Sequence, residues 1–90
     1  METVAALTNL EAEVTQTCSV LGLNGSTMQL KFPHHLTVGS AVKIEADDTI
    51  SLGEVSYCRR EGDGYVVWVE LIQALRHVTE LSRLARALVS

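Results

Sequence analysis

Apolar and polar residues alternate with a period of two in several short segments of the first two thirds of the chain. In residues 26–32, for example, Met28, Leu30 and Phe32 fall on one side and the residues between them on the other. Successive side chains of a β-strand point to opposite faces of a sheet, so this period predicts half-buried strands. The same pattern, with some irregularity, predicts further strands at 14–20, 41–46, 50–59 and 65–71.

Turn signals separate these segments at the spacing of hairpins. Asn24-Gly25 predicts a type I′ turn, because both central positions of that turn need a positive φ. Residues 47–49 and 61–64 are rich in Asp and Gly and predict two more turns. The 90 residues leave room for one domain. Short strands joined by turns in such a chain predict an all-β fold, a small antiparallel β-barrel of about six strands.

The last fifth of the chain changes to helical spacing, with apolar residues at 71, 75, 78, 81, 84, 85 and 88. This spacing predicts a C-terminal amphipathic α-helix over about residues 72–89. We therefore expect residues 13–90 to form the barrel and its helix, and residues 1–12 to form an N-terminal segment whose order the sequence leaves open. The apolar stripe of the helix either packs on its own barrel or docks on a partner or a second copy. Its candidate interface residues are Leu75, Val78, Leu81, Ala85 and Leu88.

The charge distribution excludes one class of partner. Seven basic and 11 acidic residues give a formal net charge of −4. A nucleic-acid binder gains most of its affinity by neutralising phosphates, so this balance argues against one. Residues 1–30 contain no Lys or Arg, and the first basic residue is Lys31. The N-terminal third therefore has no cationic side chain with which to hold a phosphate.

Several other classes are also excluded. The chain begins without a basic region or a long apolar run, which predicts neither a secretion signal nor a membrane span. We expect Cys18 and Cys58 to be reduced, buried thiols, and the protein to be cytoplasmic. The histidines and cysteines lack the spacing of a metal site. The adjacent acids at 47–48 are expected to be solvated in a turn, and no nucleophile is paired with a base. We therefore expect no metal, no cofactor and no catalytic residues.

Three sequence elements follow one another in the order of a known family. Residues 19–23 match its Ser-x-x-Gly-Leu element, and residues 36–44 match its Leu-x-x-Gly-x-x-Val-x-Ile element. Residues 53–59 and 65–71 are similar to its final hairpin, after which a C-terminal helix is usual. The chain thus resembles the PilZ family over roughly residues 14–88. PilZ domains are bacterial and are best known as receptors for the second messenger cyclic di-GMP. The resemblance implies a role in signalling linked to motility, pili, exopolysaccharide or biofilms.

The ligand motif of that family is only partly present. Its Asp/Asn-x-Ser-x-x-Gly element corresponds to Thr17, Ser19 and Gly22, and its N-terminal Arg-x-x-x-Arg is absent. Arginine suits both the phosphates and the guanine edges of the ligand. Losing two such contacts, at about 1.5–3 kcal/mol each, weakens binding about a thousandfold or more. Trp68 stands where the family usually has Gly and would fill the outer face of the sheet. The remaining arginine pairs, at 59–60 and at 83 and 86, are expected to be solvated.

These departures predict a non-catalytic, PilZ-like adaptor that acts by protein–protein contact through Trp68 and the C-terminal helix, without binding cyclic di-GMP on its own. One alternative is a cyclic di-GMP receptor that uses Thr17, Ser19 and Gly22 together with arginines from a partner or a second copy. A backbone nest near residues 22–25 is another option for holding a phosphate. An unrelated SH3-like barrel that binds a peptide is a further alternative, although its groove needs clustered aromatic residues.

Overall fold

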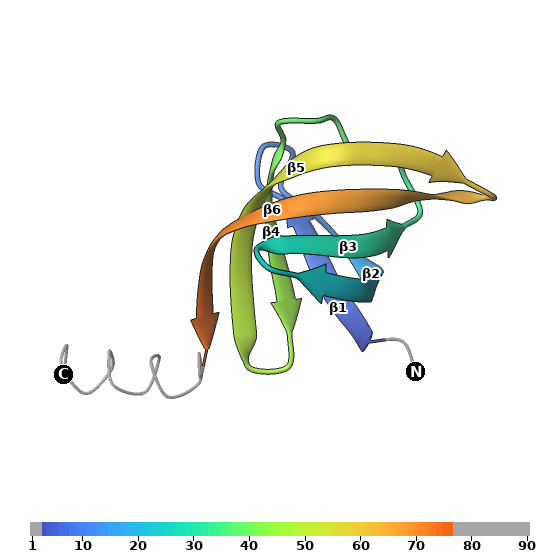
Figure 1. Cartoon of the computed structure of the whole chain (residues 1–90). Coiled ribbons are helices and arrows are strands. Elements are labelled where there is room, and N and C mark those ends of the chain that lie inside the picture. The colour runs from blue at the N-terminus through green and yellow to red at the C-terminus, as the bar shows by residue number, and fades with distance from the viewer. Residues whose placement is uncertain (1–2, 77–90) are drawn as a thin grey trace, which may run out of the picture.

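Six antiparallel strands pair around a closed ring in the computed structural model, which describes residues 3–76 (Figure 1). The order around the barrel is β1-β2-β3-β6-β5-β4. The strands are β1 (Thr3–Asn9), β2 (Val14–Asn24), β3 (Thr27–Phe32), β4 (Ala41–Ala46), β5 (Thr49–Glu61) and β6 (Gly64–Arg76). The prediction of a small antiparallel barrel of about six strands is therefore confirmed.

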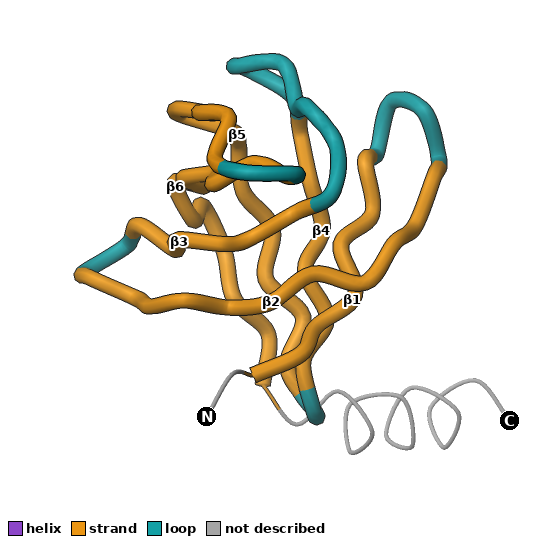
Figure 2. The backbone as a smooth tube through the Cα atoms, turned by 90° about the vertical axis from the view of Figure 1, so that its right-hand side faces the viewer, coloured by secondary structure: helices purple, strands orange, loops and turns teal. Residues whose placement is uncertain are grey.

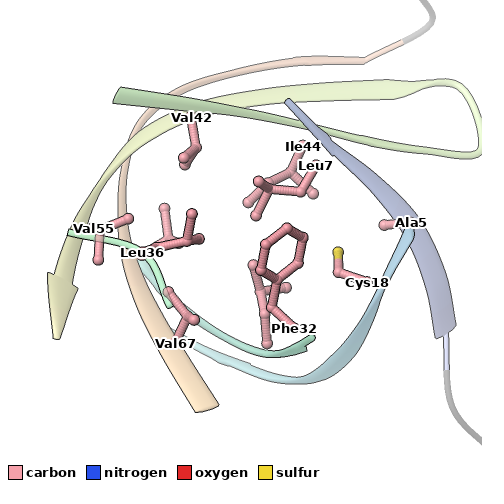
Figure 3. Close-up of a cluster of buried hydrophobic side chains, with 11 residues drawn as sticks. Ala5, Leu7, Cys18, Phe32, Leu36, Val42, Ile44, Val55 and Val67 are labelled. Atoms are coloured by element: carbon pink, nitrogen blue, oxygen red, sulfur yellow. The ribbon is translucent and has the colours of Figure 1, made fainter. Parts of the chain in front are cut away.

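The barrel core consists of the apolar residues that the period of two placed on one face. Leu30 and Phe32 of β3 meet Val42 and Ile44 of β4 in one buried cluster (Figure 3). Leu36, from the connection between β3 and β4, is buried in the same cluster. Closing the sheet removes these side chains from water, and this burial of apolar surface is the main stabilising effect in a fold of this kind. It also leaves few exposed strand edges.

The β2–β3 hairpin turns one residue later than the sequence predicts. Asn24 pairs with Thr27, so the central residues of the turn are Gly25 and Ser26. Gly25 has a φ of 63°, and Ser26 is not among the residues with positive φ. A positive φ at the first central position alone is the pattern of a type II′ turn, which favours glycine there. The predicted hairpin is confirmed, and the predicted type I′ geometry is wrong.

β1 corrects the expected boundary of the barrel at residue 13. It pairs with β2 on one side and with β4 on the other, so it closes the ring (Figure 2). Ala5 and Leu7 of this strand are buried in the core. The alternation in β1 is weak because its centre is Ala5-Ala6, and alanine contrasts little with its neighbours. Closing the barrel, rather than a strong local pattern, places these residues in a strand.

β6 corrects the expected start of the C-terminal helix. The strand continues to Arg76, and its last residues pair with the beginning of β5, with Ile50 opposite Leu75 and Thr49 opposite Arg76. A spacing of four residues, as between positions 71 and 75, fits one face of a strand as well as one face of a helix. Residues 72–76 continue the strand instead of beginning a helix, because the start of β5 is available to pair with them. The rest of the predicted helix, residues 77–89, lies outside the described residues.

β5 and β6 form a long ribbon that bends sharply and projects beyond the barrel at its turn (Figure 1). Their register shifts twice, between Leu52 and Gly53 and between Val55 and Tyr57. Each shift leaves one residue unpaired, Ile72 in β6 and Ser56 in β5. β-Bulges of this kind bend a strand and redirect nearby side chains. The two bulges therefore shape the outer face of the barrel beside the ribbon.

Candidate binding surface on the outer face of the barrel

Four residues lie side by side on the outer face and form what we call the aromatic row: Gly22, Gln29, Trp68 and Tyr57. They come from β2, β3, β6 and β5, in that order across the sheet. The strand register places Gln29 opposite both Gly22 and Trp68, and Tyr57 opposite Trp68. These residues lie far apart in the sequence. Pairing of β3 with β6 brings them into one row.

Trp68 is the centre of this row. Its ring lies 5.1 Å from the Tyr57 ring, centroid to centroid, at an angle of 49°. The guanidinium carbon of Arg59 lies 5.5 Å from the Trp68 ring centroid, within the range of a cation–π interaction. Tyr57 keeps 52% of its surface exposed. Trp68 itself is half-buried. A pair of aromatic rings on the outer face with a flanking arginine has the composition of a protein-binding hot spot.

An open hollow of about 390 Å³ lies on the other side of Trp68. Gly22 contributes to it because a Cβ atom there would have no neighbour within 4 Å. The other lining residues are Leu23, Asn24, Thr27 and Gln29. Trp68 therefore contacts Tyr57 on one side and borders open space on the other, where a ligand group would meet an indole and the amide of Gln29.

Charged residues lie on both sides of the aromatic row. Lys31 and Arg59 are the two register partners of Val66, one row away from Trp68. Val66 is buried, and long cationic side chains commonly cover such a neighbour with their aliphatic stems. On the opposite side, Glu70 lies across from Glu54. The outer face thus changes from cationic to acidic across the aromatic row.

The carboxylate of Glu70 is held by two hydroxyl groups. The Ser26 hydroxyl donates to Oε1, and the Thr27 hydroxyl donates to Oε2 at 2.7 Å. These hydrogen bonds, from Ser26 first and from Thr27 second, lower the pKa of Glu70 below its ordinary value. The ionised form of Glu70 therefore stabilises the junction of the β2–β3 turn with β6.

This contact predicts a pH dependence of stability. Because the pKa of Glu70 is lower in the folded state than in the unfolded state, its contribution is present above the ordinary pKa of 4.5 and is lost as the pH falls through the folded value. We expect Glu70→Gln to lower the midpoint of urea unfolding near neutral pH and to leave it unchanged at about pH 2.5. Glu11→Gln, at an exposed position, is the matched control. An equal effect of Glu70→Gln at both pH values would contradict the assignment.

The predicted ligand residues do not form one site. Thr17 and Ser19 line a hollow of about 320 Å³ at the end of β3, together with Lys31, Pro33 and Asp63 among others. Gly22 lines the separate hollow beside Trp68. The bulge in β2 between Val20 and Gly22 separates the two. The three residues of the partial ligand motif are thus divided between a hollow with hydroxyl groups and a hollow with an aromatic wall.

Lys31 is a residue that reasoning from the sequence did not include in the site. It lies directly opposite Ser19 in the β2–β3 hairpin. The turn signal at Asn24-Gly25 contained this information, because a tight turn there places Ser19 near Lys31 across the hairpin. Arg59 was also interpreted differently. It was expected to be solvated, whereas it pairs with Glu61 at 3.1 Å and its guanidinium lies over the Trp68 ring.

The predicted interface is only partly within the described chain. Trp68 lies on the outer face, as expected, and Leu75 lies in β6 opposite Ile50. The remaining candidates lie outside the described residues: Val78, Leu81, Ala85 and Leu88. The aromatic row is therefore the part of the predicted interface that the structure describes.

The described residues contain two cysteines, and neither has the features of a reactive site. Cys18 is buried in the core, and burial raises the pKa of its thiol, which makes it a poor nucleophile. Cys58 is half-buried, and both cysteines are free.

Over residues 3–76, no group of three or more His, Cys, Asp or Glu side chains could hold a metal ion. Nor does that range include a helix with the length and apolar character needed to cross a membrane.

The chain was compared with family models, with curated proteins and with solved structures, and none of them matches it. Inference about function therefore depends on the residues of the outer face.

Proposed function

We propose that this protein is a non-catalytic interaction module that binds a partner protein through the aromatic row on the outer face of its barrel. The observation that carries the proposal is the Tyr57–Trp68 pair on the outer face of the sheet, in which Tyr57 is exposed and Trp68 is half-buried, outside the barrel core. Tryptophan and tyrosine are enriched at the centres of protein interfaces, because they bury a large apolar area and keep a polar group for hydrogen bonding. Resemblance to PilZ domains suggests a bacterial, cytoplasmic signalling adaptor as the setting.

The proposal predicts that Trp68→Ala weakens partner binding enough to lose the partner in a bait experiment while the barrel stays folded. Bait experiments with the whole chain and a bacterial lysate should recover proteins that wild type and Val38→Ala retain and Trp68→Ala loses. Val38 is the matched control because it is also exposed and apolar but lies in the β3–β4 connection. With the purified partner, Trp68→Ala should weaken binding about tenfold or more. Equal retention by all three baits would contradict the proposal.

A cyclic di-GMP receptor is the second candidate, and one observation favours it. Lys31 lies beside the hydroxyl groups of Thr17 and Ser19, in a hollow that could accept a phosphate. Two considerations weigh against unaided binding. Arg59 is already engaged by Glu61 and by the Trp68 ring, and residues 1–30 contain no basic side chain.

We expect calorimetric titration of the isolated chain to show no low-micromolar binding of cyclic di-GMP. Trp68 is the single tryptophan, so its fluorescence gives an independent measure of any ligand on this face. Saturable, low-micromolar binding that Lys31→Ala removes would replace the adaptor proposal with the receptor. Stabilisation by cyclic di-GMP only in the presence of a partner would support the version in which the partner supplies the arginines.

A further inference from the structure

A notch opens on the outer face between the two bulges of the β5–β6 ribbon. It has a volume of about 190 Å³, and its lining residues are Glu54, Val55, Ser56, Glu70 and Ile72. Ser56 and Ile72 are the two unpaired residues of the bulges. A regular ribbon would place the neighbouring side chains closer together. The two irregularities therefore create the notch, and bulges commonly occur where a sheet presents a functional group.

Two of the residues that line the notch are glutamates. Glu54 and Glu70 lie directly opposite each other on β5 and β6, an arrangement of like charges that destabilises a sheet. The Glu70 carboxylate is turned toward β3, where it accepts hydrogen bonds from Ser26 and Thr27. Glu54 Oε1 lies on the other side, 4.0 Å from the position that a Cβ atom on Gly39 would occupy.

No cation of the described chain neutralises this pair. Lys43 pairs with Glu45 and Arg59 pairs with Glu61, and neither of these ion pairs includes Glu54 or Glu70. A positive group placed in the notch would relieve the repulsion and interact with both carboxylates. The chain as a whole carries a net charge of −4, which favours a basic partner through electrostatic complementarity.

The surroundings of the notch favour arginine over other cations. Ile72, with 74% of its surface exposed, provides an apolar wall for an aliphatic stem. Ser56 donates its hydroxyl to the Trp68 carbonyl oxygen, and its neighbour in the chain is Tyr57, whose exposed ring offers a surface for a planar cation. A guanidinium group has donors on several sides and can bond two carboxylates at once, whereas an ammonium is a compact and strongly hydrated charge.

We propose that the notch receives an arginine side chain from a basic segment of a partner protein, with its guanidinium group between Glu54 and Glu70. This inference rests on the proposed function, because it names the chemistry of the partner that binds beside the aromatic row. Arginine enters the notch while the residues next to it in the partner contact Tyr57 and Trp68. The acidic side of the aromatic row thus selects the partner, and the aromatic pair supplies apolar contact.

The test uses the whole chain and a short probe peptide, acetyl-Leu-Arg-Leu-amide, followed by amide chemical shifts in NMR spectra. We expect saturable shifts centred on Glu54, Ser56 and Glu70, with a dissociation constant on the order of 1 mM. The same peptide with citrulline in place of arginine keeps the shape and loses the charge, and it should cause no saturable shift. Equal binding of the two peptides would overturn the proposal.

Charge-removing variants locate the site. Glu54→Gln and Glu70→Gln should each weaken the arginine peptide about fivefold, as expected for an exposed pair of charges. Glu45→Gln is the matched control, because Glu45 is an exposed outer-face acid that already pairs with Lys43. Each variant must keep the amide spectrum of the folded barrel. A loss of affinity as large for Glu45→Gln as for Glu54→Gln would show non-specific attraction and would overturn the assignment.

Other results separate this inference from the proposed function. If Trp68→Ala still loses its partner while the arginine peptide fails to bind, the interaction module stands and the arginine site falls. If the arginine peptide binds and Trp68→Ala loses no partner, the proposed function falls instead. A dimer of the chain in sedimentation that Arg60→Gln dissociates would place the arginine of a second copy in the notch, and it would overturn the assignment to a partner protein.

Discussion

Replacing Leu30 with alanine should lower the free energy of unfolding by about 2–5 kcal/mol. Leu30 has 0% of its surface exposed and lies in the middle of β3, opposite Val20 of β2 and Val67 of β6. The substitution removes buried apolar atoms and leaves a cavity that the two neighbouring strands cannot fill, because they are held by their own pairing. A small domain has a total stability of about 5–15 kcal/mol, so this loss is a large fraction of the whole.

Urea unfolding followed by circular dichroism measures this effect. Leu23→Ala is the matched control, since Leu23 has the same side chain on the adjacent strand but is 58% exposed. It should change the free energy of unfolding by less than about 0.5 kcal/mol. A loss below about 1 kcal/mol for Leu30→Ala would mean that Leu30 is not part of a closely packed core.

Replacing Gly53 with alanine should destabilise the barrel by about 3 kcal/mol. An added Cβ atom would lie 2.6 Å from the Glu70 carbonyl oxygen and 2.7 Å from Val69 Cγ1. The first of these neighbours is backbone of the paired strand, so relief of the clash requires β5 and β6 to move apart. Gly53 sits at the register shift where the ribbon bends, and the absence of a side chain permits this close approach.

Thermal unfolding provides the measurement for Gly53→Ala, with an expected fall in Tm of about 12–24 °C. Gly22→Ala is the control, because a Cβ atom at Gly22 meets nothing within 4 Å. Its Tm should stay within a few degrees of wild type or rise, as replacement of glycine reduces the entropy of the unfolded chain. Equal Tm values for the two variants would contradict the close approach of β5 and β6 at Gly53.

The bend at Gly53 also connects stability to the proposed function. The same register shifts that need Gly53 leave Ser56 and Ile72 unpaired, and these two residues line the notch beside Glu54 and Glu70. Straightening the ribbon would close the notch and change the position of Tyr57 relative to Trp68. We therefore regard the two bulges as the structural origin of the binding surface.

The inward faces of β3 and β4 were determined by the sequence alone. Val42 and Ile44 point into the core, and Lys43 between them points outward, because successive side chains of a strand lie on opposite faces. The hairpin of β2 and β3 was also predictable from the sequence, because a tight turn favours a glycine with positive φ such as Gly25. Counting residues from that turn places Lys31 opposite Val20, and the bulge in β2 between Val20 and Gly22 shifts its partner to Ser19.

The tertiary structure decided which distant strands meet. Pairing of β3 with β6 places Gln29 beside Trp68, and Ser26 and Thr27 within reach of Glu70, across about half of the chain. It also decided that residues 3–9 close the barrel and that residues 72–76 continue β6 instead of beginning a helix. The physical reason is that a local pattern reports only whether a strand can bury one face. The choice of its neighbours depends on closing the whole ring, where the gain from pairing the last edges outweighs weak local preferences.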